Sequence, residues 1–320
     1  MLKDLTYNVI IIDDEVDLYE DYAEIIEEKL SAEGYILTHE RWEELSELEN
    51  YPLDEVDLFL VDLKFGKEDK GPEFIKKIRE HHLTDILFYS SDAEAIQFHR
   101  KSGEFQGVFF AIRDENKDEI IDMINHLTDK MIKRSNTPIS SRGIVLGSVA
   151  EIDNIIKSKV SVLFSKASPE QRSRITQDCC RIFFDSYKGN SNKINQFFGC
   201  DFHNGMKQWS DTKSEYKEFD ISDLVNYVGI TDSNKNFRIL LKIYKKLIGE
   251  DDTYTNIKSF TNLLGDRNIF AHVQEEKNTD GNYQFKRLNN DEYLVLTDDK
   301  CRELRQSIVT YFTAINDLIS

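Results

Sequence analysis

An apolar run that ends in two adjacent acids places the strongest constraint on how this chain can fold. The run is Val9-Ile-Ile-Ile-Asp-Asp-Glu15, and four consecutive β-branched residues are typical of a strand buried on both faces of a parallel sheet. Asp13 and Asp14 then lie at the carboxyl end of that strand, the edge where open α/β sheets bind ligands. Two adjacent carboxylates repel each other unless a cation lies between them, and oxygen ligands suit Mg²⁺. An ordinary acidic turn after a strand is the alternative interpretation.

The alternation of apolar strands and amphipathic helices continues through residues 1–134. We expect five strands, each followed by a helix, which is the (βα)₅ pattern of a doubly wound parallel sheet. Helices are predicted from apolar residues at helical spacing, and strands from apolar runs bounded by polar residues. After the first strand, the expected strands are 35–38, 56–62, 86–91 and 107–112, and the expected helices are 17–30, 41–48, 72–81, 94–102 and 117–133.

Polar side chains follow several of these strands at the point where each strand ends. Asp62 ends the third strand, Ser90 ends the fourth, and Arg113 follows the fifth. Because the carboxyl ends of parallel strands meet at one edge of a sheet, we expect these side chains to converge with Asp13 and Asp14. The resulting pocket combines two acids for a cation, a third acid, a hydroxyl and a fixed positive charge.

With these features, residues 7–134 resemble the receiver domain of two-component response regulators, whose fold is flavodoxin-like. The resemblance implies that Asp13 and Asp14 hold Mg²⁺ and that the backbone carbonyl of Lys64 also binds the metal. It implies that Asp62 is the phosphoacceptor, which takes a phosphoryl group from the histidine of a kinase. The chemistry is consistent, because an aspartate can form an acyl phosphate and Mg²⁺ neutralises the transferring oxygens.

The resemblance also assigns a switch that reports phosphorylation. Ser90 matches the switch hydroxyl, Phe110 the switch aromatic residue, and Arg113 stands where the family has a lysine. Arginine keeps the charge but presents a planar fork, and Asp114 replaces the usual proline that follows. The loop 65–70 also lacks the family's common proline. A receiver-shaped domain that serves only for docking is therefore the alternative to a phosphorylatable receiver.

Charge is distributed unevenly along the 320 residues. Residues 1–134 carry 34 acidic and 16 basic side chains, a balance of −18 that equals the charge of the whole chain, so the remainder is neutral. The acidic half should repel nucleic acid. No run approaches the roughly 18 apolar residues of a membrane span, the N-terminus lacks a signal peptide, and the four cysteines lack disulfide-framework or metal-ligand spacing. We expect a cytoplasmic protein without a membrane partner.

The polar stretch 135–143, which contains Pro138 and Gly143, predicts a linker between the receiver-like domain (1–134) and a second domain (144–320). We expect the second domain to be a helical bundle with one β-hairpin. The absence of a compact basic recognition helix argues against a DNA-binding output. The expected helices are 144–165, 169–187, 221–228, 236–248, 253–264 and 298–319, the hairpin strands are 283–285 and 293–296, and short helices and loops are expected over 190–218.

The motif Gly265-Asp-Arg-Asn-Ile-Phe-Ala-His272 carries candidate chemistry in the second domain. Arg267 is a permanent cation suited to a phosphodiester, and His272 can move a proton near neutral pH. Together they can drive attack of an RNA 2′-hydroxyl on its own phosphate without a metal. An offset of five residues is about 140° round a helix, so a single helix does not align the two side chains well. If the helix instead starts after Arg267, both side chains can face one groove, and a second copy across a dimer can complete it.

A helical domain with Arg-Asn-x-x-x-His resembles the HEPN superfamily, many of whose members are metal-independent, dimeric ribonucleases of toxin and antiviral systems. The resemblance implies that Arg267 and His272 are catalytic, that Asn268 supports them, and that a homodimer acts on RNA. In the alternative interpretation, Asn268 caps a helix and His272 packs there, as in non-catalytic relatives. The sequence thus predicts a response regulator with a ribonuclease effector for stress or antiphage defence. The rival hypothesis is a non-enzymatic signalling adaptor that binds a protein partner.

Overall fold

The computed structural model describes residues 2–64, 70–80, 82–103, 105–114, 118–198, 221–226, 231–287 and 291–319. The chain divides into two compact units. Unit 1 comprises Met1–Ile144, Glu276–Gln284 and Val295–Gln306, and unit 2 comprises Val145–Glu275, Phe285–Leu294 and Ser307–Ser320. Two short C-terminal segments therefore belong with the N-terminal unit, which the sequence does not indicate.

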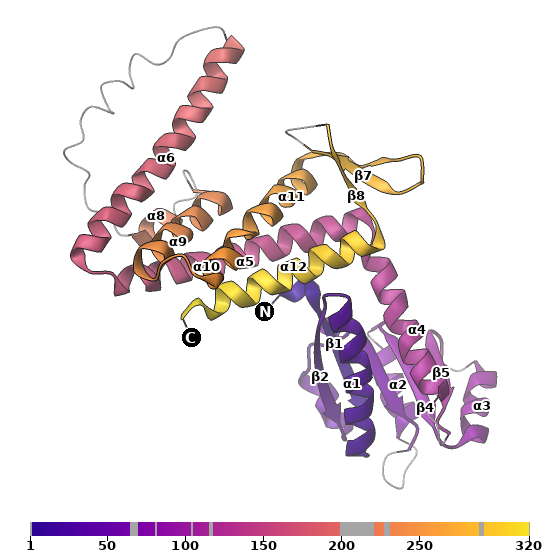
Figure 1. Cartoon of the computed structure of the whole chain (residues 1–320). Coiled ribbons are helices and arrows are strands. Elements are labelled where there is room, and N and C mark those ends of the chain that lie inside the picture. Colours follow the sequence, from indigo (N-terminus) through magenta and orange to yellow (C-terminus); the bar gives the residue numbers. More distant parts are fainter. Residues whose placement is uncertain are drawn as a thin grey trace. The chain divides into compact units, whose positions relative to one another are not determined.

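Five parallel strands form the sheet of unit 1 in the order β2-β1-β3-β4-β5 (Figure 1). This is the strand order of flavodoxin-like doubly wound folds, so the predicted fold class is confirmed. All residues of β3 and most of β1 are buried, because both strands lie inside the sheet with helices over its faces. The strands are β1 (Thr6–Ile12), β2 (Ile36–Trp42), β3 (Leu58–Asp62), β4 (Asp85–Ser90) and β5 (Val108–Ile112).

Helices cover the sheet in two layers. α1 (Val16–Ala32) contacts α4 (Asp118–Ser135), and Lys29 of α1 forms an ion pair with Asp129 of α4 at 2.8 Å. α2 (Gly71–Arg79) and α3 (Ala93–Ser102) supply buried residues to a second core, built on alternate residues of the strands. This core contains Phe74, Ile75 and Ile78 of α2, Ile96 of α3, and Ile10, Ile12, Phe59, Val61, Ile86 and Phe88 of the strands.

The connection between β2 and β3 differs from the predicted helix over 41–48. β2 continues to Trp42, which is paired in register with Ile12 and only 2% exposed. Two 3₁₀ helices follow, η2 (Leu45–Asn50) and η3 (Leu53–Glu55). Mutual hydrogen bonds between Glu44 and Glu47 form a capping box at the start of η2, which favours a short turn there. The apolar spacing that predicts a helix instead places Trp42 and Leu48 in the core.

The first half of α12 (Asp298–Asn316) packs on the turn between α1 and β2, within unit 1. Arg305 is 2% exposed and donates to the backbone oxygen of Glu33 (2.7 Å) and to its Oε2 atom (3.0 Å). Its guanidinium lies 4.7 Å from the centre of the Tyr35 ring. Gly34 has φ +79°, and a Cβ atom there would lie 2.7 Å from the backbone nitrogen of Gln306. The close approach of α12 to this turn therefore requires glycine at position 34 and is stabilised by the hydrogen bonds of Arg305 to Glu33.

The predicted linker over 135–143 is mostly helical. α4 ends at Ser135 and α5 (Pro138–Lys166) begins at Pro138, so Asn136 and Thr137 separate the two helices. Proline is well suited to the first helical position, where no backbone N–H is needed. The proline that predicts a linker is thus the start of a helix.

Helices also build unit 2, whose core includes the T-shaped pair of Phe237 and Phe260, with ring centres 5.0 Å apart. The predicted helix over 253–264 is interrupted at Ser259, whose hydroxyl donates to the Asn256 carbonyl (2.6 Å). Residues 190–198 continue a helix rather than forming loops, and residues 199–218 lie outside the described residues. Besides α5, the helices are α6 (Pro169–Phe198), α8 (Ile221–Asn226), α9 (Ser233–Leu247), α10 (Asp252–Lys258) and α11 (Phe260–His272).

The predicted β-hairpin is part of a three-stranded sheet in the order β6-β7-β8. β7 (Tyr283–Lys286) and β8 (Tyr293–Leu296) are the expected strands, and β6 (Glu276–Lys277) pairs antiparallel with β7. A short 3₁₀ helix, η5 (Asp317–Ile319), follows α12. Within the described residues, none of the helices combines the length and hydropathy needed to cross a membrane.

Candidate functional site

Three carboxylates meet at the carboxyl edge of the parallel sheet. Asp13 and Asp14 follow β1 and Asp62 ends β3, and one oxygen of each lies within 4.8 Å of the others. Asp13 is fully buried, Asp62 is 3% exposed, and Asp14 is exposed to solvent. The two neighbouring parallel strands bring these acids together, as the sequence pattern predicts.

Burial disfavours the charged form of the two inner carboxylates, Asp13 and Asp62. Desolvation, together with the nearby Asp13 carboxylate, raises the pKa of Asp62 to about 7. Burial also raises the pKa of Asp13, an effect opposed by its hydrogen bonds. A donor set made of carboxylate oxygens, two of them buried and mutually repelling, fits a hard divalent cation such as Mg²⁺.

Tyr89 is a member of the site that the sequence does not reveal. This fully buried residue of β4 donates its hydroxyl to Oδ2 of Asp13 at 2.6 Å, while Oδ1 of Asp13 accepts from the backbone N–H of Glu15 at 2.8 Å. Tyr89 is in register with Asp62 on the adjacent strand. The available signal is that a buried tyrosine hydroxyl needs a hydrogen-bond partner, but Tyr89 follows the apolar residues Ile86, Leu87 and Phe88, which suggests core packing.

Arg113 supplies the fixed cation beside the acids. Its Nη2 atom forms an ion pair with Glu15 at 2.9 Å, and its Nη1 atom lies 4.0 Å from Oδ2 of Asp13. Nη1 is buried and has no hydrogen-bond partner among the described residues. The planar fork of arginine therefore contacts Glu15 and still presents a donor toward the cluster.

Ser90 and Lys64 are linked through Asp92 at the start of α3. The Ser90 hydroxyl is buried and accepts from the backbone N–H of Asp92 at 3.2 Å. Asp92 caps α3 by accepting from the Ala95 N–H at 3.0 Å, and it pairs with the Lys64 ammonium at 3.1 Å. The Lys64 backbone N–H points to Oδ1 of Asp62 at 3.4 Å, so its peptide lies beside the cluster.

Phe110 lies on β5, one strand beyond Ser90. It is half-buried, its ring centre is 6.0 Å from that of Phe88, and its backbone oxygen accepts from Arg100 at 2.9 Å. Phe110 is therefore a neighbour of the site rather than part of its polar lining.

Gly71, the first residue of α2, packs directly on the backbone of the cluster. A Cβ atom at this position would lie 2.3 Å from the Asp62 carbonyl oxygen and 2.8 Å from the Phe88 ring. A side chain here would displace the segment that carries Asp62. Most of the loop between Lys64 and Gly71 lies outside the described residues.

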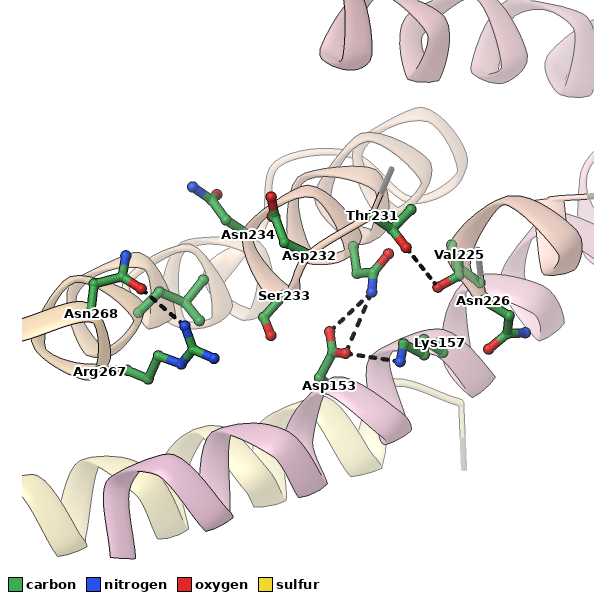
Figure 2. Close-up of a pocket in the computed structure, with 12 residues that line it drawn as sticks. Asp153, Lys157, Val225, Asn226, Thr231, Asp232, Ser233, Asn234, Arg267 and Asn268 are labelled. Carbon is green, nitrogen blue, oxygen red and sulfur yellow. Dashed lines mark hydrogen bonds and ion pairs between the residues drawn. The ribbon is translucent and has the colours of Figure 1, made fainter. Parts of the chain in front are cut away.

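The Arg267 motif adopts a different geometry from the one expected. α11 begins at Phe260, so Arg267, Asn268 and His272 all lie on one continuous helix. Arg267 and Asn268 line a pocket of about 460 Å³ in unit 2, whereas His272 is exposed at the end of α11 and does not line it (Figure 2). The condition under which both side chains could face one groove, a helix that starts after Arg267, is not met, because α11 begins earlier, directly after Ser259.

Comparisons with known proteins do not assign the chain to a sequence family. No protein-family model and no curated protein matches the chain. Among solved structures, a crystal structure of NtrX from Brucella abortus matches at 18% identity with a TM-score of 0.30. The match covers 43% of this chain and 31% of the NtrX chain. The receiver-like description of unit 1 therefore depends on its own strand order and parallel α/β sheet.

Proposed function

We propose that this chain is a two-component response regulator that accepts a phosphoryl group on Asp62 from the histidine of a kinase. The observation that carries the proposal is the approach of three carboxylates, two of them buried, within 4.8 Å at the carboxyl edge of a sheet with order β2-β1-β3-β4-β5. Arg113 and Ser90 flank this cluster from the two following strands. A nucleophile, a metal-binding acid pair, a cation and a hydroxyl are the components that phosphoryl transfer to aspartate needs.

In this proposal, Asp13, Asp14, Asp62 and the Lys64 carbonyl would hold Mg²⁺, which supplies charge neutralisation for the phosphoryl oxygens. An oxygen of Asp62 attacks phosphorus, the N–P bond of the donor breaks, and its electron pair returns to the imidazole. Arg113 places its unpaired donor where negative charge gathers. Tyr89 and Glu15 orient Asp13 through its two oxygens.

The phosphorylated site is read out through Ser90. A new hydrogen bond from its hydroxyl to a phosphoryl oxygen changes the position of the Ser90 oxygen that accepts from Asp92. Asp92 holds both the cap of α3 and the Lys64 ion pair, so the start of α3 is the first element expected to respond.

A matched pair of variants tests the phosphoacceptor. The full chain is incubated with phosphoramidate and Mg²⁺, and its intact mass is measured for wild type, Asp62→Asn and Asp57→Asn. Asp57 precedes the same strand at its other end and accepts from the Asn8 N–H at 2.9 Å, a bond that asparagine can keep. We expect one added phosphoryl group in wild type and Asp57→Asn, and none in Asp62→Asn. Equal labelling of all three proteins would contradict the assignment.

For unit 2 we propose a HEPN-like, metal-independent ribonuclease that works as a homodimer. The supporting observation is that Arg267 is half-buried in a polar pocket with Asn268 as its partner at 3.2 Å. Because His272 lies outside this pocket, catalysis would require a second chain to bring a histidine to it. A role in stress or antiphage defence would follow. The alternative is a non-enzymatic adaptor whose helical domain binds a protein.

RNA cleavage separates these two proposals. Wild type and His272→Ala are compared on an RNA pool, with and without phosphoramidate and Mg²⁺. Cleavage that is lost in the variant and altered by the phosphodonor is expected of a phosphorylation-controlled ribonuclease. If wild type cuts no RNA under either condition, the ribonuclease proposal fails and the adaptor remains.

A further inference from the structure

The pocket beside Arg267 has a polar wall contributed by three long helices of unit 2. Figure 2 shows Arg267 and Asn268 on α11, facing Asp153 and Lys157 of α5 and the start of α9. Its volume of about 460 Å³ falls in the range of small-molecule sites, which is roughly 300–1,000 Å³. Asp232 and Asn236, at the start of α9, also line the pocket.

Most charges of the pocket are already compensated. Lys157 pairs with Asp153 at 3.1 Å within α5. Asp232 pairs with Lys235 at 2.7 Å and caps α9 by accepting from the Lys235 N–H at 2.8 Å. The start of α9 is therefore occupied by its own cap and offers no anion site.

Arg267 is the exception. Its hydrogen bond to Asn268 joins two neighbours on the same helix, and its buried Nε atom has no partner among the described residues. No carboxylate of the described residues forms an ion pair with it. An arginine in a polar pocket without a counter-charge leaves a site for an oxyanion, for which its planar fork is suited.

Asn236, on the wall of the same pocket, has a second polar atom that lacks a hydrogen-bond partner among the described residues. Its side chain is 1% exposed, and its Nδ2 atom donates to Oδ1 of Asp153 at 3.1 Å. Its Oδ1 atom is buried and has no partner among the described residues. Leaving a buried amide oxygen unpaired costs about 1–3 kcal/mol, so a hydroxyl or amino donor from a ligand is favoured here.

We propose that this pocket binds a small hydroxylated oxyanion, a phosphomonoester or a carboxylate, with Arg267 holding the anionic group and Asn236 accepting from a hydroxyl. The site is complete within one chain and does not depend on the receiver or on ribonuclease activity. His272 takes no part in it, because it lies outside the pocket.

The test is calorimetric titration of the full chain with ribose 5-phosphate, ribonate and uncharged ribose. We expect saturable binding of at least one of the two anions and none of ribose. Arg267→Gln should weaken that binding tenfold or more, the effect of losing a hydrogen-bonded charge, whereas His272→Gln should leave it unchanged. If Arg267→Gln melts well below wild type, Arg267→Lys replaces it, with a loss of about threefold or more expected from the missing fork.

Two results would overturn the inference. One is the absence of saturable binding of either anion to wild type, and the other is unchanged affinity in the Arg267 variant. The ribonuclease proposal fails by a different route, since RNA cleavage should require His272 and anion binding should not. Phosphomonoester and carboxylate ligands are distinguished by which of the two anions binds.

Discussion

Replacing Asp62 by asparagine should stabilise the folded protein in the absence of divalent cations. Burial and Asp13 raise the pKa of Asp62 from 3.8 to about 7, so the ionised form is disfavoured in the folded state. At 1.36 kcal/mol for each pH unit, the penalty approaches about 4 kcal/mol above pH 7, an upper bound for a carboxylate near a second titrating acid. Asparagine removes the charge and can still accept the Lys64 N–H.

The sign of the pH dependence follows from proton binding. Between about pH 4 and pH 7 the folded chain holds a proton on Asp62 that the unfolded chain has lost, so wild-type stability falls as the pH rises through this window. The stabilising effect of Asp62→Asn should therefore be less than half as large near pH 5 as near pH 8, where it is largest. Each kcal/mol corresponds to roughly 2–4 °C in melting temperature for a domain of this size.

Thermal melts in EDTA at about pH 5 and about pH 8 measure this effect, with Asp122→Asn as the control. Asp122 is an exposed aspartate in α4, so the same chemical change there should leave the melting temperature nearly unaltered. Mg²⁺ should raise the melting temperature of wild type more than that of Asp62→Asn. An Asp62→Asn protein no more stable than wild type at pH 8, or equally stabilised at both pH values, would refute the reasoning.

Three further variants test the surroundings of the site. Tyr89→Phe removes the hydroxyl that orients Asp13 and should weaken the apparent affinity for Mg²⁺. The Mg²⁺ concentration needed for a half-maximal labelling rate should rise about tenfold, measured by titrating Mg²⁺ against labelling rate. Gly71→Ala places a Cβ atom against the Asp62 carbonyl and should lower the free energy of unfolding by about 1–3 kcal/mol in denaturant melts, with slower labelling. Arg305→Ala leaves Glu33 without its buried partner and should destabilise by about 3 kcal/mol, whereas Arg302→Ala, which removes a more exposed partner of the same carboxylate, should have a smaller effect.

The sequence predicts the sheet of unit 1 well because its strands are apolar runs that end in chemically distinctive residues. Asp13, Asp62 and Ser90 are placed at the carboxyl edge by strand periodicity alone. Tyr89 is missed because a strand buried on both faces shows no alternation that separates a site residue from a core residue.

The pattern of apolar residues does not predict contacts between distant residues or some of the helix boundaries. The contact of Arg305 with the α1–β2 turn joins residues 272 positions apart, and an arginine in an amphipathic helix suggests an exposed face. Trp42 and Leu48 lie in a stretch predicted to be helical, yet they reach the core from a strand and a 3₁₀ helix. The interruption at Ser259 decides that Arg267 and His272 share one helix, and nothing in the local composition requires a break there.

The most direct test of the central claim is to locate the phosphoryl group on the chain. The protein is incubated with phosphoramidate and Mg²⁺, treated with borohydride to reduce any acyl phosphate to homoserine, and mapped by peptide mass spectrometry. The proposed function predicts homoserine at position 62 and its disappearance when Mg²⁺ is chelated. Homoserine at another aspartate, or an unmodified Asp62 under all conditions, would contradict it.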